Sequence, residues 1–179
     1  MTLIDGRWIA VMDGLLTAEE CRGFIALLDR PEGLQRIDGG YAEYDRAVYV
    51  SAEWAARIWG RVRESLPVEL RGDDVYVNDY FRFSKYHPGQ SFNVHRDGRN
   101  VDASGGAAFM TINIFLNSDF VGGETAFYDG TGEVLRAQPA AGRGAVFDGQ
   151  ILHAGLLVRE GYKYLLRTDL MWRRRGGAL

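Results

Sequence analysis

The sequence predicts a mostly β protein, a barrel or jelly roll braced by helices on one side. Three observations lead to this fold class. From residue 75 onward, apolar and polar residues mostly alternate in about eight short segments, with the period of a half-buried strand. Glycine-containing or polar turns separate these segments. Two helix patterns precede them without a linker, so we expect one domain over residues 1–179.

The N-terminal part supplies the expected helical support, over residues 13–66. Thr17-Ala-Glu-Glu20 is a capping-box pattern that begins a helix. Trp54, Ile58 and Val62 recur at four-residue spacing, as on one face of a second helix. In chain order, the expected elements are a strand over 7–12, a helix from Thr17 that carries Cys21 and ends before Pro31, a loop with Gly39-Gly40, and a helix over about 51–65.

The β core is expected over about residues 75–172, followed by a frayed basic tail at 173–179. The expected strands lie at 75–86, 91–97, 108–117, 124–128, 133–136, 144–148, 151–158 and 162–172. Within 108–117, alternation places two sets of side chains on opposite faces. Met110, Ile112, Ile114 and Leu116 are expected to pack under the helices, while Thr111, Asn113 and Phe115 face the other way.

Composition and charge narrow the class of function. Hydrophobic residues make up 46% of the chain and charged residues 25%, enough to form a core. The net charge of −3 indicates neither a nucleic-acid nor a membrane partner. No apolar run is long enough to span a bilayer and no targeting signal is visible, so we expect a cytoplasmic protein. The single cysteine, Cys21, excludes multi-cysteine metal sites, so any metal needs histidine and carboxylate ligands.

Two of the three histidines fit a metal site. His95 and Asp97 are two residues apart in a strand pattern, which places both side chains on one face. His153 lies in a later apolar strand. Taken alone, His-x-Asp is usually a surface pair and an apolar-flanked histidine a core residue. Together, two imidazoles and a carboxylate on a barrel form the facial triad of non-haem Fe(II) oxygenases, which leaves positions open for oxygen and a co-substrate. His87, before Pro88-Gly89, is expected to be structural or exposed.

Five linked motifs resemble one family. They are 85–98 (KYHPGQSFNVHRDG), 120–127 (FVGGETAF), 142–148 (GRGAVFD), His153-Ala-Gly, and 161–169 (GYKYLLRTD). In order and spacing they resemble the 2-oxoglutarate/Fe(II)-dependent dioxygenases, most closely the prolyl 4-hydroxylase-like branch. The resemblance spans roughly residues 9–172.

The resemblance implies a double-stranded β-helix, jelly-roll or cupin-like, as a single catalytic domain with the N-terminal helices on one sheet. It makes His95, Asp97 and His153 the ligands of Fe(II), with 2-oxoglutarate and O₂ as co-substrates and ascorbate as a candidate reductant. The implied reaction hydroxylates an aliphatic C–H bond and yields succinate and CO₂. The substrate is then an amino-acid-like, peptidyl (prolyl-type) or small molecule. Because Asp97 is intact, the halogenase variant of the family is disfavoured.

The same resemblance implies a co-substrate site. The distal carboxylate of 2-oxoglutarate needs a cation in an apolar pocket. Lys163 lies ten residues after His153, where the prolyl hydroxylase branch places its lysine. Lys163 is therefore the expected anchor, and Arg167, on the same strand face, is the alternative. Tyr86 matches the tyrosine that the family uses at this carboxylate, and Asn113 and Thr125 are further expected contacts.

The alternation of residues leaves two alternatives open for the substrate contacts and two for the loop that follows the first metal ligands. Asn78, Tyr80 and Arg82 share the strand face of Tyr86, so they either contact substrate or hydrogen-bond within the barrel wall. The polar segment 99–107 (RNVDASGGA) follows the first ligands and is either a lid that closes over substrate or an ordinary hairpin loop.

Two other functions are compatible with these residues. One is a non-catalytic metal- or ligand-binding protein with the same β-helix fold. The other is a zinc or manganese hydrolase that uses the same three ligands. The identity of the substrate and the oligomeric state are left open by the sequence.

Overall fold

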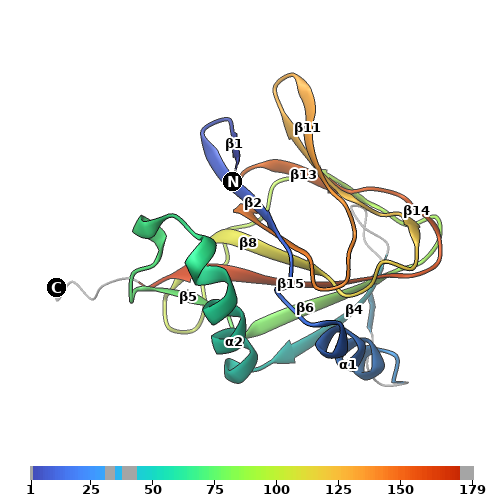
Figure 1. Ribbon diagram of the computed structural model, residues 1–179, viewed down its shortest axis with the longest axis horizontal. Coiled ribbons are helices and arrows are strands. Elements are labelled where there is room, and N and C mark those ends of the chain that lie inside the picture. The colour runs from blue at the N-terminus through green and yellow to red at the C-terminus, as the bar shows by residue number, and fades with distance from the viewer. Residues whose placement is uncertain (1, 31–34, 38–43, 174–179) are drawn as a thin grey trace.

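Two β-sheets face each other in the computed structural model, which describes residues 2–30, 35–37 and 44–173 (Figure 1). Together they form a double-stranded β-helix, the predicted fold class. Within the described residues, the major sheet runs β1 (Thr2–Ile4), β2 (Arg7–Met12), β12 (Gly144–Asp148), β8 (Ala107–Phe115), β15 (Lys163–Trp172), β6 (Tyr80–Tyr86), β4 (Tyr44–Val50) and β3 (Gln35–Ile37), with β5 (Val75–Val77) also paired to β15. The minor sheet runs β11 (Gly132–Ala137), β10 (Thr125–Asp129), β13 (Leu152–Gly155) and β7 (Phe92–His95). A short pair joins β9 (Val121–Gly122) to β14 (Val158–Glu160).

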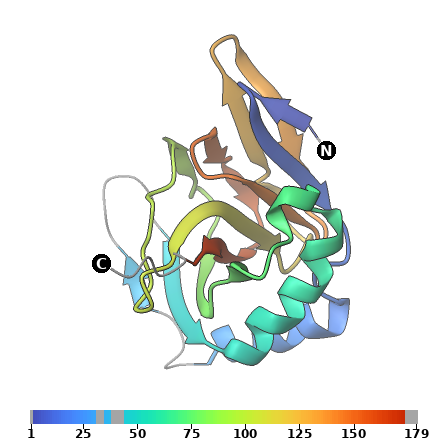
Figure 2. The same ribbon diagram turned by 90° about the vertical axis from the view of Figure 1, so that its left-hand side faces the viewer.

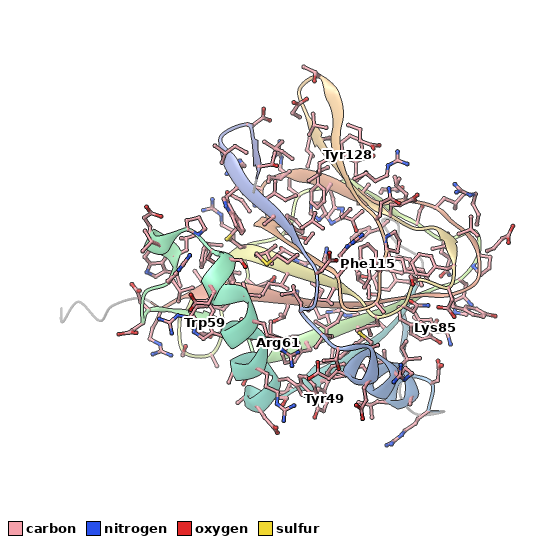
Figure 3. The ribbon with its side chains drawn as sticks, in the orientation of Figure 1. Tyr49, Trp59, Arg61, Lys85, Phe115 and Tyr128 are labelled. Atoms are coloured by element: carbon pink, nitrogen blue, oxygen red, sulfur yellow. The ribbon has the colours of Figure 1, made fainter. Side chains whose placement is uncertain are left out.

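Both predicted helices are present, and they lie together against one face of the major sheet (Figure 2). Helix α1 (Ala18–Leu28) begins after Thr17, and the predicted capping box is complete. Helix α2 (Ala52–Val62) is capped by Ser51 and continues into the 3₁₀ turn η1 (Arg63–Ser65), followed by η2 (Val68–Leu70). An ion pair joins the two helices, because Arg61 (labelled in Figure 3) donates to both carboxylate oxygens of Glu20 at 2.7 and 2.8 Å. The helical layer is therefore held as a unit.

The major sheet separates two apolar clusters. On the helix side, the predicted row Met110, Ile112, Ile114 and Leu116 packs with Phe24 and Ile58, as expected from the alternation. Between the two sheets lies a second cluster centred on three aromatic side chains, Phe115 (labelled in Figure 3), Phe127 and Phe147. This second cluster packs beside the buried polar groups between the sheets, because the ring centroid of Phe147 lies 4.7 Å from that of His153.

The predicted strands differ from the observed ones in several places, and three of these differences bear on the site. Residues 44–50, expected as part of a loop, form β4, which pairs with β6 along its length. The segment 75–86 is interrupted at Asn78-Asp79, where β5 and β6 meet β15 in registers two residues apart. Strand β7 ends at His95, so Asp97 lies in the following loop, where its N–H bonds to the carbonyl of Gly149 at 2.8 Å. These differences come from pairing with distant strands.

Segment 99–107 forms a hydrogen-bonded hairpin loop in this structure, and its closure over substrate stays a prediction. Asp102 accepts hydrogen bonds from the N–H groups of Ser104 and Gly106 and from the hydroxyl of Tyr76. Val101 bridges to Ala107 across the turn. The loop expected at Gly39-Gly40 and the tail at 174–179 lie outside the described residues. In the part of the chain that the structure describes, no helix has the length and apolar character needed to cross a bilayer.

Gly142 gives a stability prediction. It holds a positive φ of +79°, and an added Cβ would lie 1.9 Å from the carbonyl oxygen of Leu16. Its own carbonyl accepts the N–H of Leu15, which fixes the chain before α1 on the sheet. Gly142→Ala is therefore expected to lower the free energy of unfolding by about 3 kcal/mol or more in urea denaturation.

Gly14 provides the matched control. Its φ of +72° is similar, but nothing lies within 4 Å of an added Cβ. Gly14→Ala is expected to cost only the backbone strain, about 1 kcal/mol. Equal losses in the two variants would contradict a role for close backbone approach at Gly142.

Candidate active site

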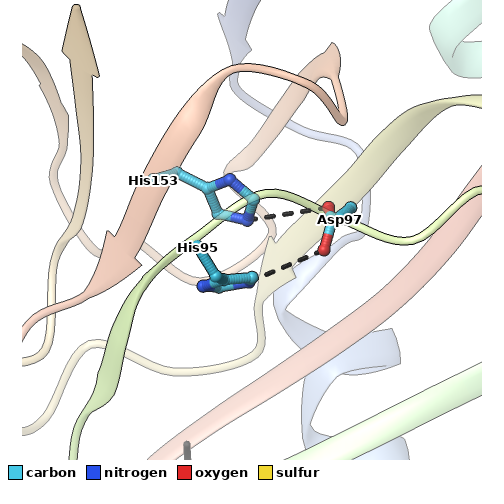
Figure 4. Close-up of side chains that lie close together, drawn as sticks. All are labelled: His95, Asp97 and His153. Carbon is cyan, nitrogen blue, oxygen red and sulfur yellow. Dashed lines mark ion pairs between the residues drawn. The ribbon is translucent and has the colours of Figure 1, made fainter.

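Three side chains from two neighbouring segments meet at the polar end of the barrel (Figure 4). His95 on β7 pairs in register with His153 on β13, which brings the imidazole centroids to 4.2 Å. Asp97 reaches the same point from the loop after β7. The nearest ligand atoms of His95, Asp97 and His153 all lie within 4.8 Å of one another.

The hydrogen bonds of these histidines leave the right nitrogen free for a metal. Nδ1 of His95 lies 2.7 Å from the carbonyl oxygen of Asn93, and Nδ1 of His153 lies 2.9 Å from that of Ile151. Because a carbonyl only accepts, each Nδ1 carries the proton and each Nε2 keeps a lone pair. Both Nε2 atoms lie 3.6 Å from an oxygen of Asp97. This donor set fits a divalent cation held by two imidazoles and one carboxylate.

The surroundings of Asp97 and His153 set their protonation. Burial opposes ionisation of Asp97, yet His95, Arg167 and His153, together with a 2.5 Å hydrogen bond from Thr111, hold its pKa well below the usual range. Burial lowers the pKa of His153 to about 4, although Asp97 opposes this. The carboxylate is therefore charged and the imidazole neutral at pH 7, as metal ligation requires.

A cavity of about 120 Å³ opens beside the two histidines. The predicted co-substrate residues Tyr86, Asn113, Thr125, Lys163 and Arg167 all line it. Other lining residues are Tyr44, Arg46, Arg82, Ser84, Phe92, Gly155 and Leu165. The structure therefore brings the expected metal ligands and the expected co-substrate contacts into one site.

Lys163 lies at the closed end of this cavity. Only 1% of the residue is exposed, and its Nζ lies 5.0 Å from the ring centroid of Tyr86 and 5.4 Å from that of Phe115. Among the described residues, no carboxylate forms an ion pair with it. Burial lowers the pKa of Lys163 to about 7, although the charge of Glu124 opposes this. A buried ammonium without a counter-charge is costly, which makes Lys163 a site for an anion.

Arg167 differs from Lys163 because it already has acidic partners. Its Nη2 lies 2.8 Å from an oxygen of Asp97 and 3.6 Å from one of Asp169. Of the two candidate anchors, Lys163 is the one with an unused charge. Asn113 adds an unused acceptor, since its buried Oδ1 has no hydrogen-bond partner among the described residues.

The three predicted substrate residues are separated by the structure. Arg82 lines the cavity and forms an ion pair with Asp169. Asn78 is buried at the break between β5 and β6, where its side chain accepts the N–H of Tyr80. Neither Asn78 nor Tyr80 is among the described residues that line this cavity. Nε2 of His87 lies 2.7 Å from a carboxylate oxygen of Asp45, outside the cavity. This contact agrees with a structural role for His87.

Sequence reasoning missed Tyr44 and Arg46, which reach the cavity from β4. It also expected Asp97 only as a metal ligand, whereas Asp97 forms an ion pair with Arg167 as well. The signal for β4 was the alternation in residues 44–50, which is short and carries polar residues on both faces.

A family model described as the 2OG-Fe(II) oxygenase superfamily matches residues 81–168, which include all three triad residues and Lys163. This segment, just under half of the chain, matches the superfamily by sequence. The oxygenase uses Fe(II) and 2-oxoglutarate, the cofactors expected from the sequence. No curated protein sequence matches the oxygenase significantly.

Solved structures share the fold of the oxygenase at low sequence identity. The viral collagen prolyl hydroxylase vCPH from Paramecium Bursaria Chlorella virus-1, in its 2OG complex, superposes with a TM-score of 0.71 at 22% identity, over 96% of this chain and 99% of that one. A prolyl-4-hydroxylase from Pseudomonas putida gives 0.69 at 18% identity, over 96% and 95%. HygX from Streptomyces hygroscopicus, bound to nickel, 2-oxoglutarate and hygromycin B, gives 0.59 at 11% identity, over 95% and 85%.

Proposed function

We propose that this oxygenase, acting as one catalytic domain, hydroxylates an aliphatic C–H group of an amino-acid-like, peptidyl or small-molecule substrate. In the balanced reaction, one O₂ supplies one oxygen atom to the substrate and one to succinate, while 2-oxoglutarate loses CO₂. The observation that carries the proposal is the pairing of an open His-Asp-His triad with a buried ammonium, that of Lys163, which forms no ion pair with the described residues, in one cavity. We also keep the expected cytoplasmic location as part of the proposal.

The chain's own residues have separate tasks in this reaction. We assign His95, Asp97 and His153 to hold the metal, with their Nδ1–H groups and Thr111 fixing the ligand orientations. When bound, Fe(II) supplies the oxygen chemistry that no amino-acid side chain can perform. We assign Lys163 to bind the distal carboxylate of 2-oxoglutarate. We assign the other polar contacts with 2-oxoglutarate to Tyr86, Thr125 and Asn113. The enclosed position of Lys163 keeps water from competing for that carboxylate.

The similar structures support both kinds of substrate. Two carry names of prolyl hydroxylases, one of them for collagen, and HygX is described with bound hygromycin B. A further one, from Trichoplax adhaerens, is a prolyl hydroxylase in complex with a hypoxia inducible factor peptide fragment. A peptide and a small molecule therefore both stay within the proposal.

Succinate formation tests the proposed function. Protein purified without oxygen and loaded with Fe(II) is expected to convert 2-oxoglutarate to succinate when O₂ is admitted, with loss of the signal when iron is omitted. A protein that binds 2-oxoglutarate without forming succinate, across a broad substrate panel, would support the non-catalytic alternative. Activity that needs zinc or manganese but no 2-oxoglutarate would support a hydrolase.

A further inference from the structure

Three arginines line the cavity on three neighbouring strands. Arg82 on β6 and Arg167 on β15 are directly paired in register. Arg46 on β4 is paired with Ser84, one inward-facing position from Arg82. All three line the same cavity as Lys163. The major sheet therefore presents a row of guanidinium groups toward the site.

The positive charge of this row exceeds the negative charge of the carboxylates that pair with it. Asp169 forms an ion pair with Arg82 and lies 3.6 Å from Arg167, which also binds Asp97. Arg46 has no ion pair with any carboxylate of the described residues. Among the described residues, the four cations of the cavity thus form ion pairs with two carboxylates, Asp97 and Asp169. A ferrous ion and a doubly charged 2-oxoglutarate cancel each other, so two positive charges remain.

This excess positive charge lies away from Lys163, the residue assigned to the co-substrate. Lys163, almost wholly buried, marks the closed end, whereas the side chains of Arg82 and Arg167 are 17% and 21% exposed. Buried Nε atoms of both arginines also have no hydrogen-bond partner among the described residues. The arginines therefore lie at the end of the cavity that a second molecule can reach.

An exposed apolar surface adjoins the arginines. Tyr49 packs against Phe24 on the helix side, so alternation places Val48 and Val50 on the opposite face, with Arg46. Val48 and Val50 are 46% and 60% exposed. Tyr80, 41% exposed, shares its face of β6 with Arg82. Charged groups beside exposed apolar side chains suit a ligand with one anionic end and one apolar body.

We propose that the hydroxylated substrate carries a free carboxylate, which binds Arg46 and Arg82 while its aliphatic part lies toward Val48, Val50 and Tyr80. This specificity rests on the proposed function of the same site. Guanidinium groups bind a carboxylate through two parallel hydrogen bonds, and Arg46, which has no carboxylate partner among the described residues, does so without displacing one of them. A free amino acid and the C-terminal residue of a peptide offer the same group.

Matched acids and amides provide the test. The iron-loaded protein is saturated with 2-oxoglutarate and given L-proline, L-leucine, L-pipecolate and proline-terminated dipeptides, each beside its carboxamide. Succinate release and a 16-dalton mass gain of the substrate are measured. At least one acid is expected to stimulate succinate release tenfold or more over its amide. Stimulation by free acids alone, or by free-terminus peptides as well, distinguishes the two sources of the carboxylate.

Arg46→Gln is the deciding variant, because it leaves no buried carboxylate without a partner. It is expected to raise KM for the acid at least tenfold and leave KM for 2-oxoglutarate unchanged, with partial recovery in Arg46→Lys. Arg57→Gln, on the exposed face of α2, is the control and should match the parent protein. A shift in KM for 2-oxoglutarate instead would overturn the assignment to substrate.

The failures of the two proposals are separable. If no condition yields succinate from 2-oxoglutarate, the proposed function fails. If succinate forms but amides stimulate as well as acids, or no acid stimulates at all, only the carboxylate specificity is refuted.

Discussion

Replacing His153 with alanine is expected to abolish turnover, with kcat falling by more than about 1000-fold. His153 is one of three groups that can hold the metal. Its ring is fixed by a hydrogen bond to the Ile151 carbonyl and by an edge-to-face contact with Phe147, with ring centroids 4.7 Å apart. With only His95 and Asp97 left, the site keeps two ligands. Succinate release under saturating Fe(II) measures the loss, and equilibrium dialysis with Fe(II) without oxygen measures metal binding.

The controls separate metal loss from unfolding. Glutamine fills most of the volume of the buried His153 side chain, so the His153→Gln protein should fold. Its binding of Fe(II) should nevertheless be weak. His87→Ala changes the same residue type at a half-exposed position that binds Asp45, and it should keep both metal and activity. Retained succinate formation in a folded His153→Gln protein would refute the triad.

Local patterns predicted the parts of the fold that local physics controls. The capping box at Thr17 was readable because both of its hydrogen bonds lie within four residues. The two faces of 108–117 were readable because alternation holds through a strand with a neighbour on each side. His95 and His153 could be proposed as partners from residue type and motif spacing, although their cross-strand pairing is a tertiary fact.

Features that depend on distant partners were missed. Strand β4 forms because it pairs with β6 along its length. The sequence of residues 44–50 by itself does not favour a strand over a loop. The cavity face of β6 was expected to extend to Asn78, but the two-residue change of register before Tyr80 ends it. Which of Lys163 and Arg167 has an acidic partner depends on where Asp97 and Asp169 lie, so alternation could not distinguish them.

Lys163→Met is expected to raise KM for 2-oxoglutarate by about 100-fold, because the carboxylate loses its charged partner in an enclosed site. Without 2-oxoglutarate, the variant should be at least as stable as the parent protein, since methionine fills a similar volume without a buried charge. Thermal unfolding with and without 2-oxoglutarate measures both effects. The parent protein gains stability from the ligand and the variant does not.

The chain offers a matched control in its other lysine. Lys85 (labelled in Figure 3) lies outside the cavity, where its partly buried ammonium binds Asp29 at 2.7 Å. Lys85→Met removes an ion pair but no cavity charge, so KM for 2-oxoglutarate should stay unchanged. A large increase of KM in Lys85→Met, or none in Lys163→Met, would contradict the assignment of Lys163.

The lowered pKa of Lys163 gives this assignment a pH signature. Between its folded pKa of about 7 and its unfolded value of 10.5, the unfolded chain binds the proton that the folded protein lacks. The free energy of unfolding of the ligand-free protein therefore gains a contribution that rises with pH across this window, by up to about 1.4 kcal/mol per pH unit. That contribution is absent in Lys163→Met, so the difference between the two proteins isolates it.

Binding of 2-oxoglutarate has the opposite dependence on pH. The carboxylate needs the protonated lysine, and above pH 7 a growing fraction of the ligand-free protein has lost that proton. KM for 2-oxoglutarate is therefore expected to rise with pH above 7 in the parent protein and in Lys85→Met, and to stay flat in Lys163→Met. The same side chain thus costs stability when the site is empty and gains affinity when the co-substrate enters. A parallel rise of KM in all three proteins would show that another group controls binding.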